Sequence, residues 1–135
     1  CLETLASAQA VVRRYKELSK GAQLVSLDEV EKRLEAGDSI ARQVVLEAGC
    51  SLGEFIGFLS ATLNIQEIIL TGDMTRFGEP WLNAVRQAML QSALERLTQN
   101  TQLEVGTLDY RACILGAAAH FLMDGYALLF RQAES

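Results

Sequence analysis

The first third of the chain repeats apolar residues at helical spacing. From Leu2 to Ser19 they recur every three or four positions, which predicts one helix with a core face of Leu5, Ala8, Val11 or Val12, Tyr15 and Leu18. The run Ser26-Leu27-Asp28-Glu29 then has the capping-box pattern, in which the serine hydroxyl and the glutamate carboxylate each accept a backbone N–H. We therefore expect a short helix over Asp28–Ala36, ended by Gly37.

A longer helix, capped by Asp38 and reaching about Thr62, carries the clearest local pattern. An apolar ridge runs along this helix and is made of Ile40, Val44, Ala48, Leu52, Ile56 and Leu59. Beside it lies a ridge of mostly small residues at four-residue spacing, made of Val45, Gly49, Gly53, Gly57 and Ala61. Each interior glycine costs about 1 kcal/mol relative to alanine, so another element must pack closely against that ridge. Arg42, Glu47 and Glu54 exclude lipid, which leaves an element of the same fold or of a second subunit. The nearly apolar second half predicts a central, buried helix.

Short apolar runs alternate with helical patterns in the second half of the chain. The run Glu67–Leu70 stops at Thr71-Gly72 and predicts a fully buried strand, followed by a loop over Asp73–Gly78. Pro80 suits the first turn of a fourth helix. The core face of that helix would be Leu82, Val85, Met89, Ala93 and Leu97.

The C-terminal segments predict one more strand and one more helix. Leu103-Glu104-Val105 reads as a short strand, and Ala112 onward as a helix whose buried side is Ile114, Leu115, Ala118, Phe121 and Leu122. Strands separated by helices predict an α/β layered fold, helix-rich with few strands. Because two strands are too few for a stable sheet, we expect others to lie upstream of Cys1 or to come from a partner.

Composition narrows the class of protein. The 135 residues are 50% hydrophobic and 21% charged, which favours one folded domain and excludes disorder. The net charge of −5 repels phosphate backbones, so we do not expect this segment to bind nucleic acid. Three separated cysteines indicate a reducing, cytoplasmic setting, and the apolar run Ala112–Met123 is shorter than the roughly 20 residues of a membrane span. The first residue, Cys1, predicts a piece of a longer polypeptide.

Two segments could carry chemistry, although no complete catalytic signature is present. Cys1-Leu2-Glu3 opens the first helix, where a thiolate has a lowered pKa and is a good metal ligand; the alternative is that Cys1 stands there only because the chain begins there. Thr71-Gly72-Asp73 lies at the C-terminal end of the main strand, where open α/β sheets usually bind ligands; the alternative is a plain turn. The chain also lacks CxxC, so it cannot build a closed zinc site alone.

These segments together resemble the ROK family of sugar-responsive repressors and sugar kinases. Cys1-Leu2-Glu3 resembles the end of that family's zinc-binding signature CxCGxxGCxE, and Ile68–Asp73 resembles its strand with the ending IVLGG. Arg76–Leu82 and Ile114–Ala119 are similar to ROK regulators as well. The resemblance implies an actin-like ATPase (ribonuclease H-like) fold, of which residues 1–135 would be a single domain, a fragment of the C-terminal lobe.

The resemblance also implies roles for individual residues. Cys1 would be the last of four zinc ligands, with three upstream, and Glu3 would reach sugar hydroxyls. Thr71, Gly72 and Asp73 would occupy the place where kinases of the family hold the adenosine of ATP. Those kinases have paired glycines after the strand, which let the backbone approach the nucleotide, whereas this chain has Thr-Gly-Asp. This departure speaks against ATP binding, and the phosphate loop and catalytic aspartate would lie upstream.

The leading hypothesis is therefore the sugar-effector-binding and oligomerisation part of a ROK-type transcriptional regulator. Such a regulator would act as a homodimer or higher homo-oligomer and bind DNA through an N-terminal domain absent from this chain, with no catalytic activity and no membrane contact. One alternative is the C-terminal lobe of an ATP-dependent ROK sugar kinase. A third is a stand-alone α/β interaction domain.

Overall fold

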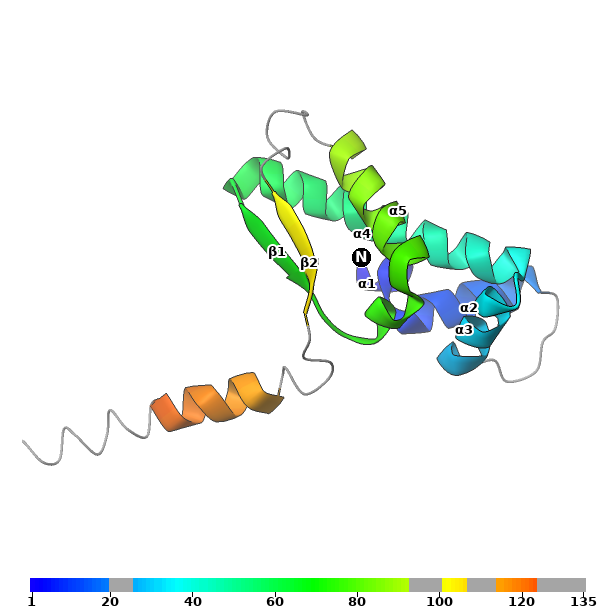
Figure 1. Ribbon diagram of the computed structural model, residues 1–135, viewed down its shortest axis with the longest axis horizontal. Helices are drawn as coiled ribbons and strands as arrows, with labels where there is room; N and C mark the ends of the chain where they lie inside the picture. The colour runs from blue at the N-terminus through cyan, green and yellow to red at the C-terminus, as the bar shows by residue number, and fades with distance from the viewer. Residues whose placement is uncertain (20–25, 93–100, 107–113, 124–135) are drawn as a thin grey trace, which may run out of the picture.

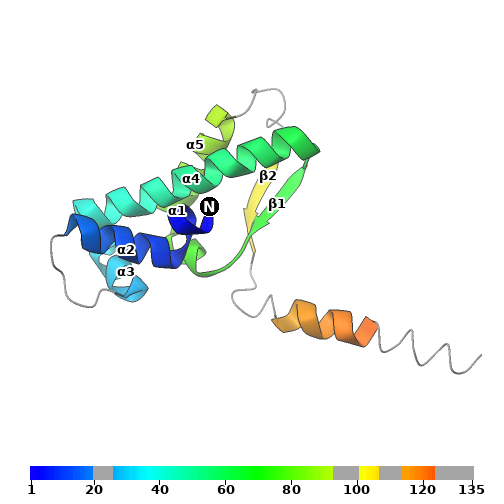
Figure 2. The same ribbon diagram turned by 180° about the vertical axis from the view of Figure 1, so that it is seen from behind.

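Helices and a small sheet are arranged around one long helix (Figure 1). The computed structural model describes residues 1–19, 26–92, 101–106 and 114–123, so the predictions for Ala93, Leu97 and Ala112 lie outside the described residues. Figure 2 shows the long helix α4 from behind, with α1, α2 and α3 toward its N-terminal half and the sheet beneath its C-terminal end. The elements are α1 (Glu3–Ala6), α2 (Ala8–Leu18), α3 (Leu27–Glu35), α4 (Ser39–Leu63), β1 (Glu67–Leu70), the 3₁₀-helix η1 (Asp73–Phe77), α5 (Gly78–Ser92) and β2 (Gln102–Val105).

The first predicted helix is broken in two at Ser7. Ser7 has an extended backbone with ψ of 163°, and its Oγ accepts a hydrogen bond from the backbone N–H of Ala10 at 3.1 Å. It therefore caps α2, which is the role that serine prefers at a helix start. The prediction of one continuous helix was wrong because the spacing of apolar residues continues unchanged across Ser7 and does not reveal that Ser7 caps a new helix. Val11 and Tyr15 are buried as expected, whereas Leu5 on α1 is 60% exposed.

Half of the predicted capping box forms at the start of α3. Ser26 Oγ accepts from the backbone N–H of Glu29 at 3.3 Å, as predicted. The carboxylate of Glu29 does not return to Ser26 but accepts from Arg33 Nε at 2.8 Å, one helical turn away. The reciprocal half of the box was therefore wrong. Gly37 follows α3 with φ of +84°, which fits its predicted role at the helix end.

Asp38 connects the start of α4 to the two preceding helices. Its Oδ1 accepts from the backbone N–H groups of Ile40 at 2.7 Å and Ala41 at 3.0 Å, which confirms the predicted cap. Its Oδ2 accepts from the Tyr15 hydroxyl at 3.0 Å, and that hydroxyl accepts from Arg33 Nη1 at 2.6 Å. The backbone N–H of Ala41, with smaller contributions from Tyr15, Ile40 and the charge of Arg33, holds the pKa of Asp38 below its ordinary value of 3.8 against the opposing effect of desolvation.

Replacement of Asp38 by alanine is expected to destabilise the fold by about 1 to 2 kcal/mol, because a helix cap and the Tyr15 contact are lost together.

A lowered pKa means that the charged carboxylate of Asp38 stabilises the folded state above the ordinary pKa, and that this stability is lost as pH falls through the folded pKa. Urea unfolding between pH 7 and pH 3 should therefore show a smaller loss of stability on acidification in Asp38→Asn than in the unchanged protein. Equal pH dependence in the two proteins would contradict this account.

The glycine ridge of α4 packs against α5, which confirms that its partner belongs to the same fold. A Cβ added at Gly49 would lie 2.9 Å from the carbonyl oxygen of Trp81, and one added at Gly53 would overlap the carbonyl oxygen of Val85. At these glycines the two helices thus approach more closely than a side chain would allow. On α5, Trp81, Leu82 and Val85 are buried in the same core as Val44 and Val45 of α4. Pro80 lies in the first turn of α5, as predicted.

The opposite side of α4 faces solvent, so the predicted complete burial of its second half was wrong. Phe58 is 63% exposed, and Phe55 and Leu63 are also exposed. Among the described residues, α4 is the one helix long and apolar enough to cross a membrane by length and composition. However, 44% of its most apolar window is buried inside the fold, and the core helix of a soluble protein meets the same criterion.

The sheet consists of β1 and β2 in parallel, with Glu67 opposite Gln102 and Leu70 opposite Val105. Both predicted strands are confirmed, but the predicted complete burial of the first was wrong, because Ile69 is 57% exposed and only Leu70 is buried. Parallel strands are normally covered on both faces. Within the described chain, other elements cover only one face of this pair. The predicted loop after β1 is instead the 3₁₀-helix η1.

The last described segment, Ile114–Met123, is helical as predicted but is exposed along its whole length. Phe121 is 78% exposed, and the other large apolar residues of the predicted buried side, Ile114, Leu115 and Leu122, are exposed as well. Figures 1 and 2 both place this orange helix away from the other elements. Its predicted burial was wrong for the described chain because none of the other described elements covers its apolar side.

Candidate effector site

The first of the predicted site segments forms a tight turn at the start of α1. The carbonyl oxygen of Cys1 accepts from the backbone N–H of Thr4 at 3.1 Å and from Thr4 Oγ1 at 2.7 Å. Both Cys1 and Glu3 are exposed, and the Glu3 carboxylate has no hydrogen bond or ion pair with any residue that the structure describes. No described residue therefore occupies the Glu3 carboxylate, which leaves it able to bind a ligand.

Zinc fits this segment only as a shared metal. A cysteine thiolate is a common zinc ligand, and Cys1 is a free, exposed cysteine. Within the described residues, no group of three or more histidine, cysteine, aspartate or glutamate side chains lies close enough together to hold a metal ion. Cys1 can thus supply one ligand, and the other ligands of a tetrahedral site would have to come from outside the described chain.

The second predicted segment, Thr71-Gly72-Asp73, links the end of β1 to η1. Gly72 has φ of +105° and ψ of −174°, a conformation that is essentially restricted to glycine. Its carbonyl oxygen accepts from the backbone N–H of Thr75 at 3.1 Å and from Thr75 Oγ1 at 2.8 Å. The side chains of Thr71 and Asp73 are exposed on either side of it. The strand therefore ends in one glycine, in a conformation that other residues rarely adopt, between two exposed side chains.

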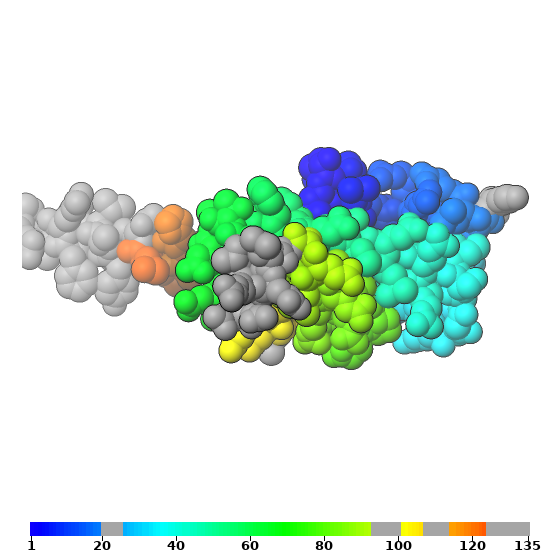
Figure 3. All heavy atoms as spheres, turned by 90° about the horizontal axis from the view of Figure 1, so that it is seen from above, coloured from blue at the N-terminus to red at the C-terminus, as the bar shows by residue number. Residues whose placement is uncertain are grey.

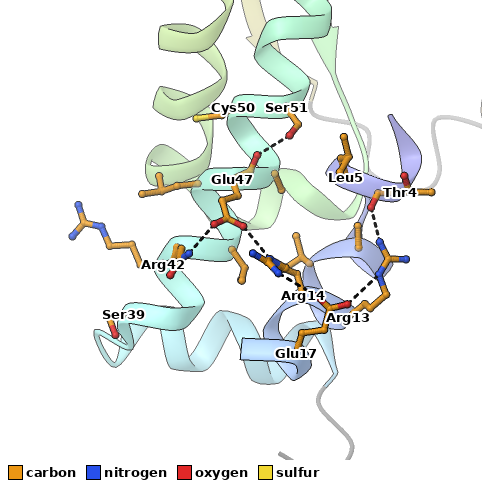
Figure 4. Close-up of a pocket in the computed structure, with 16 residues that line it drawn as sticks. Thr4, Leu5, Arg13, Arg14, Glu17, Ser39, Arg42, Glu47, Cys50 and Ser51 are labelled. Atoms are coloured by element: carbon orange, nitrogen blue, oxygen red, sulfur yellow. Dashed lines mark hydrogen bonds and ion pairs between the residues drawn. The ribbon is translucent and has the colours of Figure 1, made fainter. Parts of the chain in front are cut away.

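A hollow of about 920 Å³ lies between α1, α2 and the first half of α4 (Figure 4). Thr4 and Leu5 form one edge, directly after Glu3 in the chain. Ser39, Gln43 and Ser51 from α4 also line it. Its size is within the range of small-molecule sites, which run from about 300 to 1,000 Å³.

Arginine and glutamate side chains cross-link the walls of this hollow, as the dashed lines in Figure 4 show. Arg14 on α2 lies 3.3 Å from Glu17 on the same helix and 3.3 Å from Glu47 on α4. The hydrogen bond to Glu17, and after it the bond to Glu47, raises the pKa of Arg14 above its ordinary value. Arg13 Nη2 donates to the carbonyl oxygen of Thr4 at 2.6 Å, which joins α1 to α2. These contacts fix the hollow's rim beside Glu3.

The sequence did not reveal this cluster. The sequence marks no partner for the basic residues in the second half of the first predicted helix, and Glu47 was used there only to exclude lipid. The structure brings Arg14 and Glu47 together from positions 33 residues apart. A basic residue on one amphipathic helix and an acidic one on another were the available signals, but they do not fix which helices meet. Cys1 bonds to Thr4 at the edge of this hollow, and Glu3 precedes Thr4 in the chain. No described hydrogen bond or ion pair joins Cys1 or Glu3 to the segment Thr71-Gly72-Asp73.

Comparison with known proteins shows which family these features belong to. The sequence profile of the ROK family matches residues 1–123, and the chain therefore belongs to the ROK family. Its fold is accordingly the α/β, actin-like ATPase fold of that family, present here in part.

Both transcriptional regulators and sugar kinases are similar to this chain. The DNA-binding transcriptional dual regulator NagC of Escherichia coli K12 is 31% identical over 121 residues, which cover 84% of this chain and 30% of that protein. A glucokinase of Halalkalibacterium halodurans is 28% identical over 128 residues, covering 86% of this chain and 39% of that protein. The chain thus spans 30 to 39% of the length of these two relatives.

Solved structures do not distinguish a regulator from a kinase either. A ROK family transcriptional regulator, a homologue of the E. coli MLC protein, superimposes with a TM-score of 0.69 at 21% identity, over 78% of this chain and 28% of that one. The ROK hexokinase of Thermus thermophilus also has a TM-score of 0.69, at 27% identity, over 87% of this chain and 39% of that one. The fold is common to regulator and kinase, so function depends on the site residues.

Proposed function

We propose that this chain is the sugar-effector-binding and oligomerisation part of a cytoplasmic ROK-type transcriptional regulator. The observation that carries the proposal is the end of β1, where Gly72 is a single glycine at φ of +105° between the exposed side chains of Thr71 and Asp73. A nucleotide in this place would meet a threonine side chain where a second glycine would leave room, and a carboxylate whose charge is unfavourable beside an anionic nucleotide. The similarity to NagC is in keeping with this reading.

The N-terminal segment would supply the effector and metal contacts. Glu3 would accept hydrogen bonds from sugar hydroxyls, and Cys1 would hold zinc together with ligands upstream of this chain. Zinc in such a closed thiolate site is structural, because it fixes the segment that carries the sugar-binding residues. The cross-linked rim formed by Arg13, Arg14 and Glu47 would keep α1 in place beside the sugar.

The alternative function is the C-terminal lobe of an ATP-dependent sugar kinase. It is favoured by the similarity to the Halalkalibacterium glucokinase and the Thermus hexokinase. Phosphoryl transfer needs a phosphate clamp, a metal ion and a residue that activates the sugar hydroxyl, which the intact polypeptide would have to contain upstream.

One experiment on the intact polypeptide separates the two. Calorimetric titration with N-acetylglucosamine, xylose and glucose is expected to give binding of one sugar, and that sugar is expected to change the affinity for operator DNA about 5- to 150-fold, the usual range of allosteric coupling. The same protein mixed with ATP, Mg²⁺ and each sugar should form no sugar phosphate. Sugar phosphate formation, or sugar binding with no effect on DNA affinity, would contradict the proposal.

A further inference from the structure

The outward side of α4 forms a ridge with a hollow on each side. Figure 3 looks down on this helix, with α1 and α2 along one flank and α5 along the other. The first hollow is the one of about 920 Å³ described above, and the second, of about 810 Å³, lies between α3, α4 and α5. Arg42, Leu46 and Cys50 line both hollows, so these three residues form the crest between them. A crest flanked by two grooves is the shape that helix-on-helix packing uses.

The crest continues to Glu54 at the same four-residue spacing. Arg42 and Glu54 are both exposed, and neither has an ion pair or a side-chain hydrogen bond with any residue that the structure describes. This contrasts with Arg14 and Glu47 on the neighbouring side, which pair with each other. Arg42 and Glu54 therefore lie on one exposed ridge about 18 Å apart along the helix axis, a span set by 1.5 Å per residue.

The spacing of these four residues is self-complementary. Arg42 and Glu54 have residue 48 as their midpoint, and Leu46 and Cys50 have the same midpoint. If a second α4 crosses the ridge in antiparallel direction between Leu46 and Cys50, at the level of residue 48 along the helix axis, each Arg42 faces Glu54 of the second copy. Each Leu46 then faces Cys50 of the second copy. Such a two-fold axis gives an isologous interface with two opposite-charge pairs around a small apolar centre. A parallel arrangement would instead place like charges together.

We propose that the ridge Arg42-Leu46-Cys50-Glu54 is the interface at which α4 packs against α4 of a second copy of this chain. Ridges at four-residue spacing pack into each other's grooves at a crossing angle of about −50°. The inference refines the oligomerisation role proposed above and does not depend on the identity of the sugar.

Charge reversal on the intact polypeptide tests this arrangement. Arg42→Glu and Glu54→Arg, each of which turns two attractive pairs into two repulsive ones, are expected to raise the dimer dissociation constant about tenfold or more in sedimentation experiments. The double variant Arg42→Glu/Glu54→Arg should regain the original dissociation constant. An equimolar mixture of the two single variants should regain it as well, because each copy then meets an opposite charge on the other.

Two charge reversals away from the ridge serve as matched controls. Lys16→Glu on α2 and Glu67→Arg on β1 reverse charges at exposed sites without a described partner and should leave dimerisation unchanged. Recovery in the double variant without recovery in the mixture would mean that the charges pair within one polypeptide, and would overturn the proposal. A dimer indifferent to both reversals would overturn the interface but leave the oligomerisation role intact, whereas an entirely monomeric polypeptide would contradict both.

Discussion

Replacement of Gly53 by alanine is expected to lower the free energy of unfolding by about 2 kcal/mol, within the usual cost of overpacking a core. This reverses the usual effect, since glycine to alanine in a helix interior normally gains about 1 kcal/mol. The new Cβ would overlap the carbonyl oxygen of Val85 and lie 2.8 Å from Ala88 Cβ and 3.0 Å from the backbone nitrogen of Met89. Two of these three atoms belong to the backbone of α5, so they cannot move aside without shifting the whole helix. Urea unfolding of the intact polypeptide would measure the change.

Gly116 offers the matched control. It also lies inside a helix, Ile114–Met123, but a Cβ added there would meet nothing within 4 Å. Gly116→Ala is therefore expected to be neutral or to stabilise by up to about 1 kcal/mol. Hydrogen exchange should show faster opening of α4 and α5 in Gly53→Ala and not in Gly116→Ala. Destabilisation of equal size at both positions would mean that close packing on α5 is not the cause.

The contact between α4 and α5 was predictable because residues within one short segment of the sequence require it. Three glycines at four-residue spacing make sense only beside a close neighbour, and the sequence therefore predicts the neighbour without identifying it. The break at Ser7 was not predictable from the same reasoning, because the apolar positions on either side continue in phase. A single serine changes the path of the backbone by accepting one hydrogen bond from Ala10.

Burial was the property least accessible from the sequence. Ile69 lies in a short apolar run, Phe58 in a nearly apolar stretch of helix and Phe121 on an apolar helix face. Each of these patterns predicts that the residue faces a core. Whether a core is present on that side depends on which other segments pack there, and in the described chain none covers them. The same is true of the site. The roles of Cys1 and Glu3 follow from the family resemblance, whereas the cluster of Arg14 and Glu47 needed the fold to bring α2 and α4 together.

The largest functional effect is expected from Glu3→Gln in the intact polypeptide, if Glu3 binds the sugar as proposed. A hydrogen bond to a charged group contributes about 1.5 to 3 kcal/mol, so replacing the carboxylate by an amide should weaken sugar binding roughly ten- to hundredfold. Because Glu3 is exposed and has no partner among the described residues, thermal stability should not change. Binding to operator DNA without sugar should also be unchanged, since only the effector contact is removed.

Glu67→Gln is the control, because it makes the same substitution at an exposed carboxylate that also has no described partner. It should leave sugar affinity and DNA release at the values of the unchanged protein. Calorimetry gives the sugar affinity, and DNA binding across a sugar titration gives the concentration needed for the response. In Glu3→Gln both should shift by the same factor, because linkage ties the DNA response to sugar occupancy. Unchanged sugar affinity in Glu3→Gln would exclude this residue from the site, and a parallel loss in Glu67→Gln would attribute the effect to net charge.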